Sequence, residues 1–220
     1  MGTITRTFAN NITTSGVFKP TAFNNASFDN VTAVPSGAVE GGNMVLLSTQ
    51  TASASASISF TTGIDSTYKE YMFIFNNIHP QNNNVFFQFN LSTDGGSNYN
   101  VIKTTTAFRA YHDEADTATA FGYQTGRDLA QSSAYKDLHS DGLGNDNDAN
   151  SNGILHLFNP SDTTYVKHFL ARVNGMVNSF YEIDSFIGGY ANTTSAINAI
   201  DFKMSSGNID DGTIQMFGIL

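Results

Sequence analysis

Apolar and polar residues alternate along most of the chain after position 43, and this two-residue period predicts β-strands rather than helices. Clusters of Gly, Asn, Asp, Ser and Pro interrupt the alternation about every 8 to 12 residues, which is typical of an antiparallel sandwich. The predicted strands cover residues 44–48, 52–60, 71–77, 85–92, 99–105, 108–111, 121–123, 154–158, 167–174, 180–190, 199–204 and 213–220. We therefore expect an all-β fold, a jelly-roll-like antiparallel β-sandwich, over residues 41–220.

Some segments carry more specific expectations. Residues 71–77 and 85–92 are the most apolar runs and predict a core hairpin. Residues 213–220 are largely apolar on both faces, which suits a central strand or a subunit contact. Residues 130–138 are compatible with a turn of helix, and residues 143–153, rich in Gly, Asn and Asp, should form a protruding loop.

The first 40 residues have a different pattern, in which Phe18, Phe23 and Phe28 recur every five positions. This spacing fits neither a helix nor a strand, but it fits the coils of a pentapeptide-type β-helix. An extended arm with chance spacing explains it as well. A cluster of Pro and Gly between residues 34 and 42 separates the segment from the rest, so we expect residues 1–40 to form an arm for docking or oligomerisation.

Composition narrows the function. Charged residues make up only 13% of the chain, the net charge is -9, and the ten Lys and Arg form no cluster, which argues against a nucleic-acid partner. With no Cys, disulfides and thiolate metal sites are excluded. The sequence shows no signal peptide and no apolar run long enough to cross a membrane, so we expect synthesis in the cytoplasm without export and no membrane insertion.

Motifs for chemistry are sparse. The sequence contains no Gly-x-Ser-x-Gly and no phosphate-binding glycine loop, and its five histidines lack paired metal-ligand spacing. Asp113, Glu114 and Asp116 are the one group of carboxylates that suggests glycoside cleavage, although a solvated loop explains them more simply. We therefore expect no enzymatic activity and no catalytic residues.

Two binding sites are candidates. Asp148, Asn150 and Asn152 precede Gly153 and match the first half of a calcium-binding loop, but the twelfth position lacks the glutamate, so calcium is a hypothesis beside that of a polar loop. Separately, the aromatic rings of Tyr111, Tyr123 and Tyr135, next to Asn and Asp, suit stacking on sugar rings. Burial within strands is the alternative for each tyrosine.

Four segments of the sequence resemble virion surface proteins of marine tailed bacteriophages, of the tail-fibre or head-decoration type. They are residues 2–8 (GTITRTF), 24–32 (NNASFDNVT), 57–68 (SISFTTGIDSTY) and 212–218 (GTIQMFG). The resemblance implies an oligomeric β-rich module, with a homotrimer as the expected state, an N-terminal segment that docks on other virion proteins of the tail or capsid, and a domain that faces solvent. We therefore expect a non-enzymatic structural protein of the virion surface, made in the host cytoplasm, that is either a fibre contacting the host or a head decoration and that binds the host surface or its polysaccharide. A depolymerase and a calcium-dependent lectin on the same fold are the alternatives.

Overall fold

The computed structural model describes residues 44–220, and within them it contains strands and no helix. The strands are β1 (Met44–Thr51), β2 (Ile58–Phe60), β3 (Glu70–Pro80), β4 (Phe87–Ser92), β5 (Lys103–Asp113), β6 (Thr119–Tyr123), β7 (Leu129–Ser132), β8 (Lys136–Asp137), β9 (Ser151–Phe158), β10 (Lys167–Met176), β11 (Tyr181–Ala191), β12 (Ala199–Met204) and β13 (Ile209–Ile219). The predicted arm, with Phe18, Phe23 and Phe28, lies outside the described residues.

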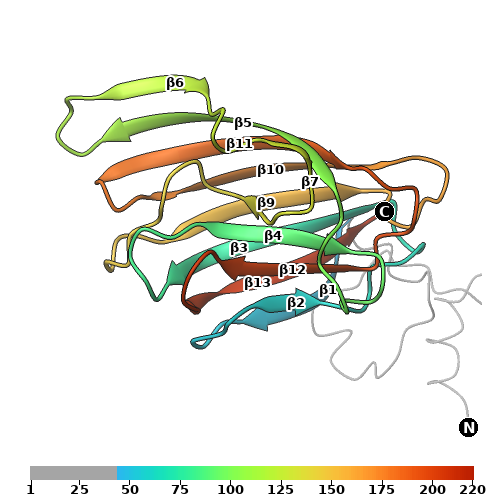
Figure 1. Ribbon diagram of the computed structural model, residues 1–220. Helices are drawn as coiled ribbons and strands as arrows, with labels where there is room; N and C mark the ends of the chain where they lie inside the picture. The colour runs from blue at the N-terminus through green and yellow to red at the C-terminus, as the bar shows by residue number, and fades with distance from the viewer. Residues whose placement is uncertain (1–43) are drawn as a thin grey trace, which may run out of the picture. The chain divides into compact units, whose positions relative to one another are not determined.

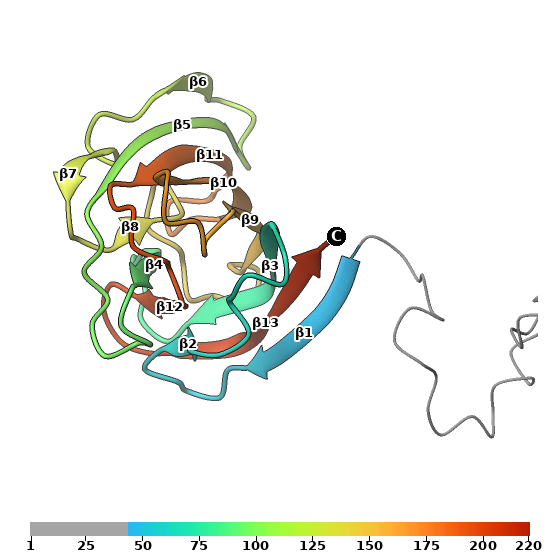
Figure 2. The ribbon, with the colours of Figure 1, turned by 90° about the vertical axis from the view of Figure 1, so that its right-hand side faces the viewer.

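The strands form two antiparallel sheets (Figure 1). A nine-stranded sheet has the order β1-β13-β3-β9-β10-β11-β5-β6, with β7 also paired to β5, and a four-stranded sheet has the order β2-β12-β4-β8. Figure 2 shows the larger sheet curving around the smaller one, which lies on its concave side. The prediction of an all-β antiparallel sandwich is confirmed.

The core between the sheets is rich in phenylalanine. Phe202 of β12 lies at its centre, and its ring centroid is 5.2 Å from that of Phe75 and 5.9 Å from that of Phe87. Phe89 of β4 packs edge-on against Phe169 of β10 at 5.2 Å. Each buried phenylalanine contributes about 2 to 3 kcal/mol by removal from water, and such ring pairs add about 1 kcal/mol. Aromatic packing therefore holds the two sheets together in a chain without disulfides.

The hairpin predicted for residues 71–77 and 85–92 is wrong. β3 pairs with β13 and β9 in the large sheet, whereas β4 pairs with β12 and β8 in the small sheet. The two segments meet face to face, since the rings of Phe75 and Phe87 are 5.2 Å apart. Both strands are apolar enough for a core, but alternation does not specify the partner with which a strand shares hydrogen bonds.

Several element boundaries also differ from the predictions. Only residues 58–60 of the predicted strand 52–60 are a strand. Residues 103–105 and 108–111 of two predicted strands belong to the single strand β5, and residues 99–102 are not in a strand. Residues 130–138 are not helical but contribute to β7 and β8. In each case tertiary pairing overrides a weak local preference.

The loop predicted at 143–153 protrudes only in its middle. Leu143 is fully buried, and its backbone pairs with Asn84 and Val85, while Ser151 begins β9. Residues 145–148 are exposed. The backbone at Leu143 finds partners on a neighbouring segment, which the composition of the loop does not reveal.

The prediction that the last strand is central is confirmed. β13 lies between β1 and β3, with Ile214 and Met216 in the core and Phe217 on the opposite face. Gly218 is required here, because a Cβ atom at this position would lie 2.4 Å from the ring of Tyr68. Ile214 and Met216 are thus buried in the core, whereas Phe217 is half-buried on the opposite face of β13.

Candidate functional site

The candidate site is the outer face of the nine-stranded sheet, which we define as the face turned away from the four-stranded sheet. Its side chains alternate with core residues along each strand. In β10, for example, Phe169 and Val173 are buried, whereas Leu170 and Arg172 are exposed. None of the four strands of the smaller sheet lies on this face (Figure 2).

Strand register aligns the apolar side chains of the outer face into rows. One row runs across five strands through Leu46, Phe217, Met72, His156 and Leu170. A side chain here is only partly covered by its neighbours within the sheet, and Leu170 is 54% exposed. Large apolar surfaces of this kind mark contacts with other molecules.

The next row ends in an aromatic ladder. The rings of Phe108 and Phe186 stack with centroids 4.9 Å apart, and Phe121 packs edge-on against Phe108 at 5.5 Å. The guanidinium of Arg172 lies over the other side of Phe186 at 5.0 Å. Phe121, at the edge strand β6, is 72% exposed. These rings form an aromatic patch at the β5–β6 end of the outer face.

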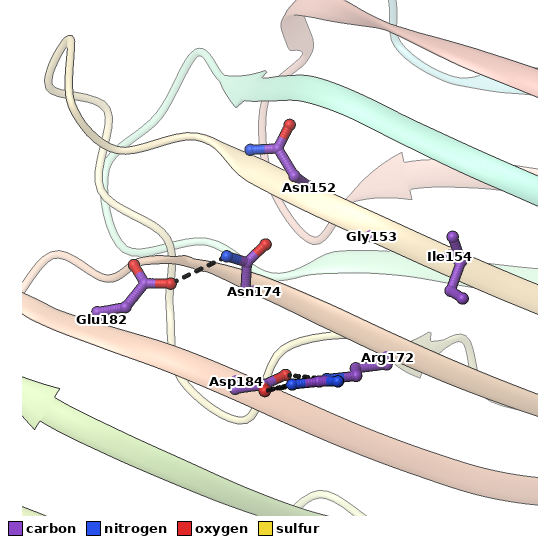
Figure 3. A pocket seen from close by; sticks show the side chains of 7 residues that line it. All are labelled: Asn152, Gly153, Ile154, Arg172, Asn174, Glu182 and Asp184. Carbon is purple, nitrogen blue, oxygen red and sulfur yellow. Dashed lines mark hydrogen bonds and ion pairs between the residues drawn. The ribbon is translucent and has the colours of Figure 1, made fainter.

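A polar hollow of about 510 Å³ interrupts the outer face over β9, β10 and β11 (Figure 3). Arg172 donates from Nε to both carboxylate oxygens of Asp184 at 3.0 Å, and Asn174 donates to Glu182 at 3.1 Å. Asn152, Gly153 and Ile154 complete the lining. Most of the polar groups in the hollow are therefore already paired with one another.

The hollow brings together two carboxylates with different environments. Loss of hydration raises the pKa of Glu182, the hydrogen bond from Asn174 opposes that rise, and the charge of Asp184 adds to it. Asp184 is held by Arg172. Residues two apart on a strand lie about 7 Å from each other, a separation compatible with paired carboxylates in glycoside cleavage. The hollow is open, however, so its geometry suits contact with a surface better than enclosure of a substrate.

The carboxylates predicted at 113–116 do not form part of this hollow. Asp113 accepts hydrogen bonds from Thr117 and Ala118, and the bond from the Thr117 hydroxyl is the main reason that its pKa is lowered. Asp116 contacts His112 at 3.1 Å, and Glu114 is exposed. The structure thus places Asp113 in a turn-stabilising role.

The calcium hypothesis for Asp148, Asn150 and Asn152 stays a prediction, but the protein itself uses two of the three oxygen donors. Asn152 lies in β9, and its Oδ1 accepts a hydrogen bond from the backbone of Asn77 at 2.8 Å. Asn150 accepts one from the side chain of Asn152 at 2.6 Å. Asp148 is exposed. A calcium ion would have to compete with these hydrogen bonds.

The three tyrosines proposed for glycan contact lie apart. Tyr111 packs against Tyr181 with the guanidinium of Arg109 over its ring. Tyr123 belongs to the outer face and is 50% exposed. Tyr135 lies beside the four-stranded sheet, where its hydroxyl donates to Asp201 at 2.9 Å. The structure therefore does not bring the three rings into one binding surface.

The histidines have local partners. His139 is buried against Ser151, His79 is near Asp210, and His156 contacts Glu70. Within residues 44–220 no group of three or more His, Cys, Asp or Glu side chains could hold a metal ion. Over the same residues no helix could cross a membrane.

Sequence reasoning did not identify Arg172, Glu182 and Asp184 as site residues. All three lie on segments predicted as strands, at positions that alternate with core residues. The alternation was a signal that they share a face, but only the register of β10 against β11 brings Arg172 next to Asp184.

Comparisons with protein-family models, with curated proteins and with solved structures find no match to this chain.

Proposed function

We propose that this chain is a non-enzymatic structural protein of a tailed-phage virion surface, of the fibre or decoration type, and that its copies associate through the outer face of the nine-stranded sheet. The apolar outer face is the observation that carries this proposal. A protein that worked alone in water would gain nothing from such a face, whereas a subunit buries it on assembly.

The occupant that fits this face is a second copy of the chain. Seven intervals of about 4.8 Å between β1 and β6, with three rows of side chains about 7 Å apart, give the whole outer face, its polar hollow included, an area on the order of 700 Å². A stable interface uses about 800 Å² on each partner. The acidic groups on the face have local partners, since Asp184 is paired with Arg172, Glu182 accepts a hydrogen bond from Asn174, and Glu70 contacts His156. A partner therefore does not need to supply opposite charges.

The virion assignment rests on the resemblance in sequence and on the low charge of the chain. The arm, residues 1–40, would attach the protein to the tail or capsid, and a trimer or another oligomer is the state that the resemblance implies. Exposed polar loops at the ends of the sandwich would contact host polysaccharide, the partner expected for a surface protein of this type.

Sedimentation analysis of the purified protein tests the association. The natural protein should sediment as an oligomer, and Leu170→Asp should weaken self-association at least about tenfold by placing a charge in the interface. Tyr165→Asp is the matched control, because Tyr165 is 72% exposed and lies outside the outer face. A monomeric natural protein, or equal loss with both variants, would refute the interface.

Antibody labelling of intact phage particles tests the virion location. Antibodies raised against residues 44–220 should decorate intact particles at defined positions in electron micrographs. Particles that carry no label, although the protein is abundant in the lysate, would count against a virion role while leaving the oligomer test unaffected.

A carbohydrate-active enzyme is the second candidate, and the hollow with Glu182 and Asp184 favours it. A glutamate with a raised pKa beside an aspartate that contacts an arginine is the arrangement of a general acid and its partner. Release of reducing ends from host polysaccharide, abolished by Glu182→Gln, would establish this activity. Absence of release by the natural protein would favour the structural role.

A further inference from the structure

Two buried polar side chains, Lys103 of β5 and Asn90 of β4, meet where the two sheets adjoin. Both are fully buried. The Nζ atom of Lys103 contacts Oδ1 of Asn90 and donates to the carbonyl of Val101 at 2.8 Å. Within residues 44–220 none of its hydrogen-bond partners is a carboxylate. The amine is therefore held against an amide without a counter-charge.

Burial also changes the chemical state of the amine. Desolvation lowers the pKa of Lys103 to about 7. A substantial fraction of Lys103 is therefore uncharged at neutral pH, and an uncharged, desolvated amine is a nucleophile.

The amide of Asn90 is oriented by four contacts. Its Nδ2 donates to the carbonyls of Tyr99 at 2.6 Å and Ser133 at 3.0 Å, and its Oδ1 accepts from the backbone N–H of Leu91 at 2.9 Å as well as from Lys103. A backbone N–H at this oxygen can stabilise the negative charge that develops when the amide carbon is attacked. The carbonyls of Tyr99 and Ser133 hold Nδ2, the nitrogen that would leave as ammonia in such an attack.

We propose that Lys103 and Asn90 join in an intramolecular isopeptide bond. The bond from Nζ to Cγ forms, the bond from Cγ to Nδ2 breaks, one proton passes from Nζ to Nδ2, and ammonia leaves. The reaction needs no oxidant or cofactor. Asp201 is buried and directly opposite Asn90 in the register of β12 and β4, where it accepts hydrogen bonds from Ser59 and Tyr135. We assign the relay of the proton to this carboxyl group because of its place in the register.

The bond would link β4 of the smaller sheet to β5 of the larger one. A cross-link restricts the unfolded chain in the way that a disulfide does, and this chain has no cysteine. The other buried lysines lack this geometry, because Lys167 donates to the carbonyls of Thr193 and Ser195, and Lys136 to that of Asp137. The contact with a side-chain amide distinguishes Lys103 from them.

Tryptic peptide mapping of the folded, natural protein tests the bond. Because trypsin does not cleave after an acylated lysine, we expect a peptide of residues 70–109 that is lighter than its sequence by one ammonia. Fragmentation should place the link between Asn90 and Lys103. A peptide of residues 70–103 with its full sequence mass as the main product would overturn the proposal.

Two variants provide matched controls. Lys103→Met should give the 70–109 peptide with no loss of ammonia and a lower melting temperature, whereas Lys167→Met should retain the cross-link. Loss of ammonia that persists in Lys103→Met would show that it arises elsewhere, for example through a succinimide, and would refute the bond. If Lys103→Met does not fold, the map of the natural protein still decides the question.

Asp201→Asn tests the proton relay by the same map. Digestion of the refolded variant should give the 70–103 peptide without the cross-link. Cross-linking at the natural rate in Asp201→Asn would overturn the role given to Asp201.

Discussion

The outward sides of the two sheets differ in a way that reverses the usual arrangement of polar and apolar groups. On the four-stranded sheet the outward side chains include Asn90 and Asp201, which are polar and are buried beneath neighbouring loops. On the nine-stranded sheet the outward side chains include Leu170 and Phe121, which are apolar and exposed. The polar side is covered by other segments of the chain, whereas the apolar side has no such cover among residues 44–220.

The two outward sides differ in whether other segments of the same chain cover them and supply hydrogen-bond partners. Asp201 accepts hydrogen bonds from Ser59 at 2.5 Å and Tyr135 at 2.9 Å, so its burial is compensated. No described segment supplies an equivalent cover for the row that contains Met72 and Leu170. The buried polar groups therefore belong to the internal structure, and the exposed apolar groups are the basis of the proposed self-association.

Phenylalanine substitutions should give the largest contrast. Phe202→Ala removes the ring at the centre of the core and should lower the free energy of unfolding by about 4 kcal/mol. Phe108→Ala, on the outer face, should cost only about 1 kcal/mol, because its ring is half-covered by Phe186 and Phe121. Urea unfolding at a concentration where the protein is monomeric measures both. Equal losses would show that the outer face is covered within the chain.

Asp201→Ala should destabilise the protein by about 3 kcal/mol, because it leaves the Ser59 and Tyr135 hydroxyls without their buried acceptor. Asp210→Ala is the control: Asp210 is exposed, and its loss should change the free energy of unfolding by less than about 0.5 kcal/mol. Thermal unfolding of the two variants under identical conditions provides the comparison. A small effect at Asp201 would mean that the covered polar side contributes little.

His139 should make the interior sensitive to acid. Complete burial, followed by the charge of Lys136, lowers the pKa of His139 from 6.5 to about 3. Between these values the unfolded chain binds a proton that the folded protein does not, so stability is full above pH 6.5 and falls as the pH drops toward 3. The loss at pH 4 should be on the order of 3 kcal/mol.

The histidine prediction is checked by measuring the free energy of unfolding between pH 4 and 7 for His139→Gln and for the exposed-site control His168→Gln. The control should keep the acid sensitivity of the natural protein, and His139→Gln should lose most of it. Parallel curves for both variants would assign the effect to other groups.

Calcium should have the smallest effect. Because the oxygens of Asn150 and Asn152 already accept hydrogen bonds, addition of calcium to chelator-treated protein should leave the melting temperature unchanged. A rise that disappears in Asp148→Ala would restore the calcium loop and, with it, the lectin alternative.

Much of the fold was predictable from local patterns. The period of two identified the segments of β10, β11, β12 and β13 and the all-β class, because alternate side chains on a strand must face opposite sides. Failures occurred where pairing mattered, as with β3 and β4, which were expected to share hydrogen bonds and instead lie in opposite sheets. Backbone donors and acceptors are the same at every residue, so alternation alone does not select a partner.

The candidate site was less predictable. Tyr123 was identified and lies on the outer face, but Arg172, Glu182 and Asp184 were not, since their relation depends on the register between two strands. The proximity of Asn90 to Lys103 was equally hidden, because one residue lies on each sheet.

The sequence by itself determined that the chain forms strands, which residues share a side of each strand, and that its stability cannot depend on disulfides. Tertiary structure alone decided which of those sides are covered. The physical reason is that alternation is a property of one strand, whereas burial depends on what packs against it. Among residues 44–220, loops cover a polar side, while an apolar side has no cover.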